Sequence, residues 1–181
     1  MLFIILAGAV LVGLIRRGKL INLTKTSFVH PWLIFLSIVL ETCLILLSKY
    51  NISLDRFAVF ICITVQYILL FAFVLFNRNL PYIWLIGTGS LLNSLVILLN
   101  KGTMPLAGSY LDFGKTNPAY DFLLNGNLPL YHIIDENTVL WFLGDIIRIP
   151  SPFSAFMSIG DIILYAGVFL MLQSIIAGKT E

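Results

Sequence analysis

Hydrophobic and polar positions divide the chain into five long apolar segments joined by short polar linkers. The apolar segments cover about residues 1–16, 31–49, 57–77, 81–100 and 158–177. A helix needs roughly 17–25 residues to cross the ~30 Å hydrocarbon core of a bilayer, and all but the first segment are of about that length. The pattern therefore predicts an all-α integral membrane protein with about five transmembrane helices in a single membrane domain, residues 1–181.

The composition favours the same class. Hydrophobic residues make up 59% of the 181 residues and charged residues only 11%, whereas soluble domains average about 25% charged residues. The formal net charge is +2, so we expect membrane lipid, and not nucleic acid, among the partners. Cys43 and Cys62 lie inside apolar segments without a Cys-x-x-Cys motif, which argues against a disulfide framework.

The charges beside the first apolar segment set the expected orientation. They follow the apolar run instead of preceding it, so we interpret residues 1–16 as a retained helix and not as a signal peptide. The positive-inside rule then places the first linker, with Arg16, Arg17, Lys19 and Lys25, in the cytoplasm. We expect a multi-pass protein whose N-terminus is outside and whose C-terminus is cytoplasmic.

Residues 101–157 have a different composition, rich in Gly, Pro, Asn and Asp. This orientation puts them on the outer face, and segments of this length without regular structure are often functional. Within them, Val139–Ile149 is apolar but too short to span, as in re-entrant or interfacial segments. Prolines at 150 and 152 then force a break. We therefore predict a short half-helix over residues 139–150, either re-entrant or interfacial, before the last helix.

The tetrapeptide Gly-Asp-Ile-Ile occurs twice, at residues 144–147 and 160–163. Ser158 and Asp161 have the spacing of a helix capping box, which explains the second aspartate without a function. Asp145 lies inside an apolar run, three residues before Arg148, a spacing that allows an ion pair on a helix. A charge at membrane depth is otherwise a candidate for a functional site. Two interpretations of Asp145 therefore stay open: a structural ion pair with Arg148, and a site that faces a ligand.

Three polar side chains are expected at a similar depth on consecutive helices. With a rise of ~1.5 Å per residue, Glu41, Gln66 and Asn93 lie about 9–13 Å below the outer ends of their helices. Polar groups in hydrocarbon need partners, so these side chains should face one another. They predict either hydrogen bonds that hold the helices together or a polar cavity roofed by residues 101–157.

His132 and Asp135 form a His-x-x-Asp pattern in the outer segment. This pattern can present metal ligands, or a base with the group that orients it. A single outer histidine is too little to predict a metal site, so the catalytic residues and cofactors are unknown. No Walker, Rossmann, His-Glu-x-x-His or Gly-x-Ser-x-Gly motif occurs, which leaves soluble-type nucleotide chemistry unsupported.

The stretches NKGTMPLAG, YHIIDENTVLWFLGDIIRIP and SIGDIILYAGVFLMLQ together resemble a family of small bacterial membrane proteins, domain of unknown function 5317. The resemblance covers nearly the whole chain. It implies an uncharacterised polytopic protein of the bacterial inner membrane, and it carries over no catalytic residue. It emphasises Asn100, Met104, Pro105, His132, Asp135, Leu143, Gly144, Asp145, Ser158, Gly160 and Asp161.

The expected function is to bind or transport a small molecule or lipid at a polar site near the outer face. In many transporters the substrate binds near the bilayer midplane, where polar groups lie beside a broken helix, and the predicted site has the same arrangement. Two alternatives are a membrane-embedded enzyme acting on a lipid-linked substrate and an accessory subunit of a larger membrane complex, and homo-oligomerisation is also open. The predicted ligand-binding residues are Glu41, Gln66, Asn93, Asn100, His132, Asp135, Asp145, Arg148 and Asp161.

Overall fold

Five long helices form the body of the protein. The computed structural model describes residues 2–50, 52, 55–109, 130–150 and 155–178. The long helices agree within a few residues with the five apolar segments, which confirms the helical fold prediction. They are α1 (Leu2–Ile15), α3 (Trp32–Lys49), α4 (Arg56–Phe76), α5 (Ile83–Leu99) and α8 (Ile159–Ile176). A short helix, α2 (Ile21–Lys25), lies in the first linker.

The helices differ in whether they could cross a membrane unaided. Within the described residues, α4 and α8 are long and apolar enough to do so. The apolar spans in the other three long helices are shorter, namely Phe3–Ile15, Trp32–Ser48 and Ile83–Leu99. By length and composition, two of the described helices could thus cross a membrane.

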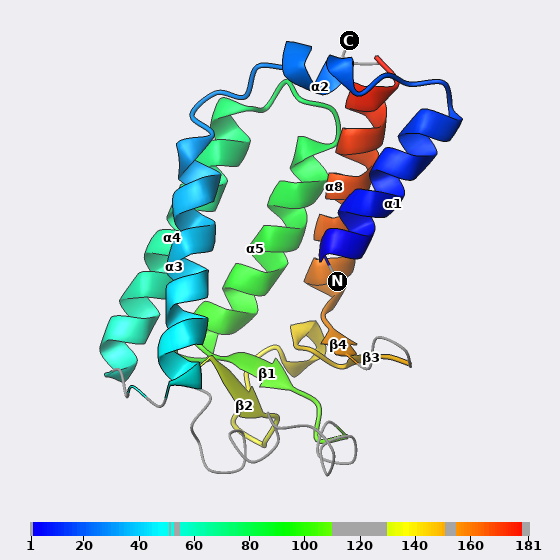
Figure 1. The fold of residues 1–181 in the computed structure, drawn as a ribbon. Helices are drawn as coiled ribbons and strands as arrows, with labels where there is room; N and C mark the ends of the chain where they lie inside the picture. The colour runs from blue at the N-terminus through cyan, green and yellow to red at the C-terminus, as the bar shows by residue number, and fades with distance from the viewer. Residues whose placement is uncertain (1, 51, 53–54, 110–129, 151–154, 179–181) are drawn as a thin grey trace.

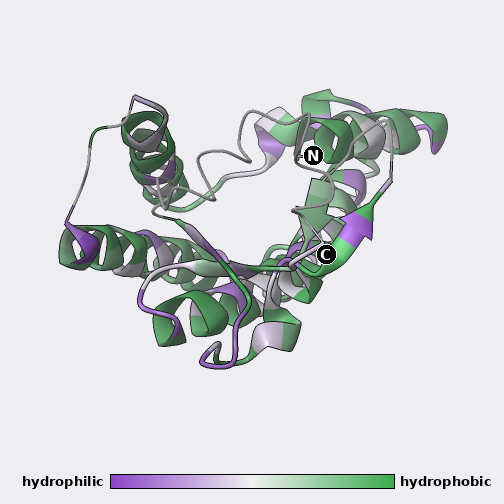
Figure 2. Cartoon of the chain, turned by 90° about the horizontal axis from the view of Figure 1, so that it is seen from below, coloured by the Kyte–Doolittle hydropathy of each residue, from purple (hydrophilic) through white to green (hydrophobic). Residues whose placement is uncertain are grey.

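The long helices form a curved row. Each contacts the next in the order α3, α4, α5, α8, α1. Figure 2 shows this row from below, with hydrophobic residues along most of each helix. Long helices that follow one another along the chain run in opposite directions, so the linkers gather at two ends (Figure 1). The α2 helix and the end of α8 lie at one end, and the start of α1 points towards the other.

Short strands between α5 and α8 cover the second end of the row (Figure 1). Strand β1 (Met104–Leu106) pairs in parallel with β2 (Tyr131–Ile133), and β3 (Ile147–Ile149) pairs antiparallel with β4 (Ala155–Met157). Leu106 also forms a bridge with Asp145. We call β1–β4 and the described residues between them the strand cap.

The predicted half-helix over residues 139–150 is wrong. The chain forms a single 3-10 turn, η2 (Trp141–Leu143), and then continues as extended backbone into β3. The β-branched residues Ile146, Ile147 and Ile149 favour extended structure, and a residue before proline is biased away from helix. Asp145 and Arg148 are therefore not one helical turn apart. Asp145 is buried and Arg148 is exposed, so the basis for the predicted helical ion pair is lost.

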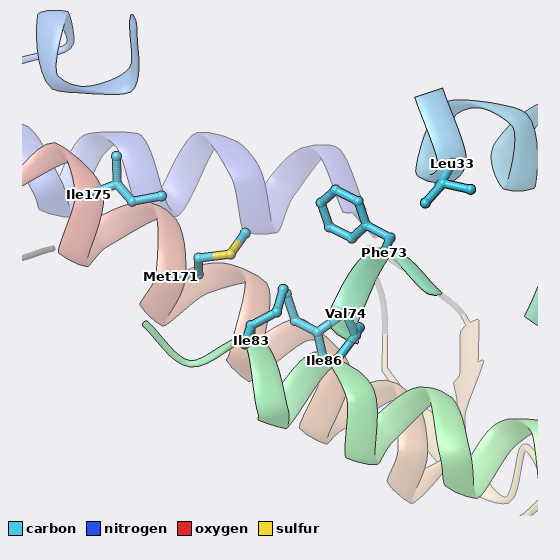
Figure 3. Packing of buried hydrophobic residues seen from close by; sticks show 7 residues of the cluster. All are labelled: Leu33, Phe73, Val74, Ile83, Ile86, Met171 and Ile175. Carbon is cyan, nitrogen blue, oxygen red and sulfur yellow. The ribbon is translucent and has the colours of Figure 1, made fainter. Parts of the chain in front are cut away.

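The main apolar core lies at the α2 end. It brings together the starts of α3 and α5 with the ends of α4 and α8 (Figure 3), through Leu33, Phe73, Val74, Ile83, Ile86, Met171 and Ile175. A second cluster of Leu44, Val59 and Ile63 lies nearer the strand cap. The α2 end thus holds the larger of the two apolar clusters.

Candidate functional site

A cavity of about 140 Å³ lies between the helices and the strand cap. Its apolar lining consists of Leu44, Ile63, Ile97, Gly102, Met104 and Leu130. Its polar lining consists of Glu41, Gln66, Tyr67, Asn93, Tyr131, Asp145 and Asp161. An apolar cavity of about 150 Å³ is known to hold benzene, so this volume suits a small molecule or the head of a larger one.

The structure brings five of the nine predicted site residues to this cavity: Glu41, Gln66, Asn93, Asp145 and Asp161. The first three are the side chains expected at a common depth, and they do line one space. That geometry does not test whether they bind a ligand, so the binding role stays a prediction.

Glu41 and Gln66 join α3 to α4 at the cavity. The side-chain nitrogen of Gln66 donates a hydrogen bond to one carboxylate oxygen of Glu41 over 3.2 Å. Glu41 is exposed, whereas Asn93 and Asp145 are buried. The cavity is therefore accessible on the α3 side.

The predicted capping box at the start of α8 is confirmed, and it extends into the cavity. The Ser158 hydroxyl accepts from the Asp161 amide over 2.9 Å and donates to the Asn93 side-chain oxygen over 2.8 Å. Asp161 accepts from the Ser158 amide over 3.2 Å and from the Asn93 side-chain nitrogen over 2.7 Å. Both carboxylate oxygens of Asp161 are thus held at the positive end of a helix dipole.

The backbone of Asp145 is hydrogen-bonded to β1 and to the residue that follows it. Its amide donates to the Pro105 carbonyl over 2.8 Å, and its carbonyl accepts from the Ala107 amide over 3.1 Å. A side chain at Gly144 would place its Cβ 2.6 Å from the Pro105 carbonyl oxygen, so only glycine allows this close approach.

The side chain of Asp145 is only 9% exposed, and its Oδ1 has no hydrogen-bond partner among the described residues. Burial, and after it the Asp161 carboxylate, raises the pKa of Asp145 from 3.8 to about 7. Desolvation disfavours the ionised form of a buried acid. Asp145 is therefore a carboxyl group that can take up or release a proton near neutral pH.

Three carboxyl groups and no basic side chain line the described part of this cavity. Across the described residues, no three His, Cys, Asp or Glu side chains lie close enough together to hold one metal ion. The site thus carries an excess of acidic groups that are spread around a space.

His132 and Asp135 belong to a separate polar cluster in the strand cap. His132 Nδ1 lies 2.8 Å from the Thr103 hydroxyl, and its Nε2 lies 3.3 Å from the Thr138 hydroxyl. Thr138 donates in turn to the Asp135 carboxylate over 3.0 Å. Burial lowers the pKa of His132 against the opposing effect of Asp135. The Thr138 hydroxyl and the Asn137 amide lower the pKa of Asp135.

Asn100 and Arg148 also lie outside the cavity lining. The Asn100 side chain donates to the Val139 carbonyl over 2.7 Å and accepts from the Val139 amide over 3.0 Å. Arg148 lies on β3 and is exposed. Asn100 thus attaches the strand cap to the end of α5, and neither residue joins the five at the cavity.

Sequence reasoning missed two tyrosines of the lining, Tyr67 and Tyr131. Tyr67 could have been found, because it lies on α4 four residues after Ile63 and directly after Gln66. Residues four apart share one face of a helix, so Tyr67 lies on the face of Ile63 and beside Gln66. Tyr131 reaches the cavity through the pairing of β2 with β1, for which the sequence holds no local signal.

Comparison with known proteins places these features within one family. Residues 25–173, which include every residue of the cavity lining, match a family of unknown function (DUF5317). An uncharacterized protein of Thermotoga maritima is 30% identical over 113 residues, which is 61% of this chain. The match also spans 61% of that relative, less than two thirds of its length. No solved structure matches the chain.

Proposed function

The chain belongs to the DUF5317 family of unknown function. For this member of the family, we propose that it is a polytopic membrane protein that binds or transports a small molecule. The ligand, free or as part of a lipid, would occupy the cavity beneath the strand cap. The observation that carries the proposal is the convergence of polar side chains from four apolar helices on one cavity. Buried polar groups are costly in apolar surroundings unless they serve packing or a ligand.

The exposed side chains of the helices support a membrane location. Phe35 is 69% exposed, Phe57 is 70% exposed and Ile68 is 59% exposed. Large apolar patches on a soluble surface mark a site of contact with another apolar phase, and lipid would supply that phase. We propose that all five long helices cross the bilayer, which can thin around the shorter ones.

The charges support the orientation. Arg16, Arg17, Lys19 and Lys25 all lie in the linker at the α2 end. The positive-inside rule makes this end cytoplasmic. The strand cap and the N-terminus then face outward from the inner membrane of a bacterium, and the C-terminus is cytoplasmic.

Cysteine labelling tests this arrangement. In a Cys43→Ser/Cys62→Ser background, we expect Glu136→Cys to react with a membrane-impermeant maleimide in cells whose outer membrane has been opened. Lys25→Cys should react only after the inner membrane is permeabilised. The reverse pattern would overturn the orientation, and equal reaction of both would overturn the membrane-spanning arrangement.

Native mass spectrometry on protein extracted gently from its own membrane tests the ligand. We expect a reproducible additional mass of small-molecule or lipid size. Gln66→Leu, which removes a polar residue of the lining, should lose this mass. Gln173→Leu, a matched change of a buried glutamine on α8 outside the lining, should keep it. A clean protein mass, or one increased only by another polypeptide, would instead favour an accessory subunit.

The geometry does not favour the enzymatic alternative. That alternative needs His132 and Asp135 to act together with Asp145, but only Asp145 lines the cavity. Both ring nitrogens of His132 lie beside threonine hydroxyls within the strand cap. A structural role for the His132 cluster accounts for these contacts.

A further inference from the structure

The charges of the cavity point to a cationic ligand. Glu41, Asp145 and Asp161 line it from α3, the strand cap and α8, and no described lining residue is basic. Like charges repel strongly where the dielectric constant is low. A ligand that carries positive charge would relieve this repulsion, whereas an anion would increase it.

One carboxylate oxygen of a cavity-lining residue has no hydrogen-bond donor among the described residues. Asp161 receives hydrogen bonds on both carboxylate oxygens, and Glu41 receives one from Gln66. Asp145, in contrast, is 9% exposed, and its Oδ1 has no partner among the described residues. A buried acceptor without a partner costs free energy. A ligand with an N–H or O–H donor would satisfy Asp145.

The spacing of the acids favours a polyatomic cation over a metal ion. No three acidic, histidine or cysteine side chains among the described residues could ligate a single ion. The space of about 140 Å³ between the carboxyl groups accommodates several non-hydrogen atoms. Tyr67 and Tyr131 are also lining residues, and tyrosine rings attract organic cations.

We propose that the cavity binds the primary ammonium group of a small molecule, whose N–H groups donate to Asp145 and to the neighbouring carboxylates. This inference rests on the proposed function and names the ligand class of the same site. Because Glu41 is exposed on the α3 side, the ligand reaches the cavity from that side. A primary ammonium group can come from a free amine or from the headgroup of phosphatidylethanolamine.

Isothermal titration of the full-length protein in detergent with ethanolamine at pH 8 tests this proposal. We expect ethanolamine to bind, and choline, which has no N–H group, to bind more weakly. Asp145→Asn should weaken ethanolamine binding by about tenfold or more, the usual effect of losing a hydrogen bond to a charged group. Glu136→Gln removes one exposed carboxylate of the strand cap outside the lining and should leave binding unchanged.

The source of the amine is decided in nanodiscs of phosphatidylethanolamine or phosphatidylcholine. If the lipid headgroup is the ligand, free ethanolamine should bind only in phosphatidylcholine discs, and phosphatidylethanolamine should co-purify. If a free amine is the ligand, ethanolamine should bind equally in both discs. Either result supports an ammonium site.

Three outcomes would overturn the inference: equal binding of choline, unchanged binding by folded Asp145→Asn, or no binding of either amine. Size-exclusion chromatography and thermal unfolding show whether Asp145→Asn is folded. If it is not, Glu41→Gln, on the accessible side, must weaken binding for the inference to stand.

A non-amine ligand seen by native mass spectrometry would refute the ammonium site and leave the proposed function intact. An absence of any bound mass would count against the proposed function itself.

Discussion

Asn93 of α5 donates a hydrogen bond from its side-chain nitrogen to the carboxylate of Asp161 on α8 over 2.7 Å. Its side-chain oxygen accepts from the Ser158 hydroxyl over 2.8 Å. Because Ser158 and Asp161 form the capping box of α8, one amide attaches the N-terminus of α8 to the middle of α5. The residues that fix this helix pair therefore include two that line the cavity.

Replacing Asn93 with alanine should destabilise the protein. Asp161 and Ser158 would each lose a partner, so we expect the free energy of unfolding to fall by about 1–3 kcal/mol. Equilibrium unfolding in detergent measures this change. Ser94→Ala is the control, because the Ser94 hydroxyl is buried but donates to the Leu91 carbonyl of the same helix. Equal stability of the two variants would contradict a role for Asn93 in joining α5 to α8.

The same two helices meet through glycines, so a methyl group at Gly89 should separate them. A Cβ there would collide with the Gly160 carbonyl oxygen and lie 2.5 Å from the Leu164 amide nitrogen. Both neighbours are backbone atoms, which cannot turn aside. We expect Gly89→Ala to lower stability in thermal unfolding by about 1–3 kcal/mol or more. Gly108→Ala, where a Cβ would have no described atom within 4 Å, should unfold like the wild type. A similar result for Gly89→Ala would mean that the helices can adjust.

The long helices and the α8 cap could be predicted because their signals are local. The length of each apolar run sets each helix, and four adjacent residues, Ser158 to Asp161, set the capping box. The strand cap could not be predicted, because β1 pairs with β2 across a long stretch of chain. The predicted half-helix failed because a short apolar run fits a helix or a strand equally well. The isoleucines near Asp145 were the better signal.

The cavity could be predicted in part, because helical rise converts sequence position into depth. Glu41, Gln66 and Asn93 were placed at one level by this argument, and they line one space. His132 and Asp135 were assigned to the site by residue type, which does not give side-chain direction. The strand pairing turns His132 towards Thr103 and Thr138 instead.

Asn100→Asp should loosen the strand cap and leave the helices intact. Aspartate can still accept from the Val139 amide, but it cannot donate to the Val139 carbonyl, and its charge would face that oxygen. We expect faster hydrogen exchange of the amides around residues 139–143. Asn77 offers a matched control at the α2 end. Its side chain accepts a hydrogen bond from the Val29 amide and donates one to the Val29 carbonyl, over 2.8 Å each. Asn77→Asp should speed exchange near Val29 only, and the same exchange pattern in both variants would refute these local roles.

Asp145 should make the protein less stable as the pH rises from about 4 to about 7. Its pKa is raised from 3.8 to about 7 in the folded protein, first by burial and then by the Asp161 carboxylate. Between these values the folded protein keeps a proton on Asp145 that the unfolded chain has released. The free energy of unfolding therefore falls across this interval, and outside it this group adds no slope.

Asp145→Asn removes this titration, so its stability should depend less on pH between 4 and 7. Above pH 7 the variant should be more stable than the wild type, by an amount on the order of a few kcal/mol, because no buried charge has to form. Thermal unfolding at a series of pH values measures both effects. Glu136→Gln removes an exposed acid and should keep the wild-type slope. Were Asp145→Asn to keep that slope as well, Asp145 would have to be ionised throughout this range. Its Oδ1, which has no partner among the described residues, would then need a donor from elsewhere in the protein.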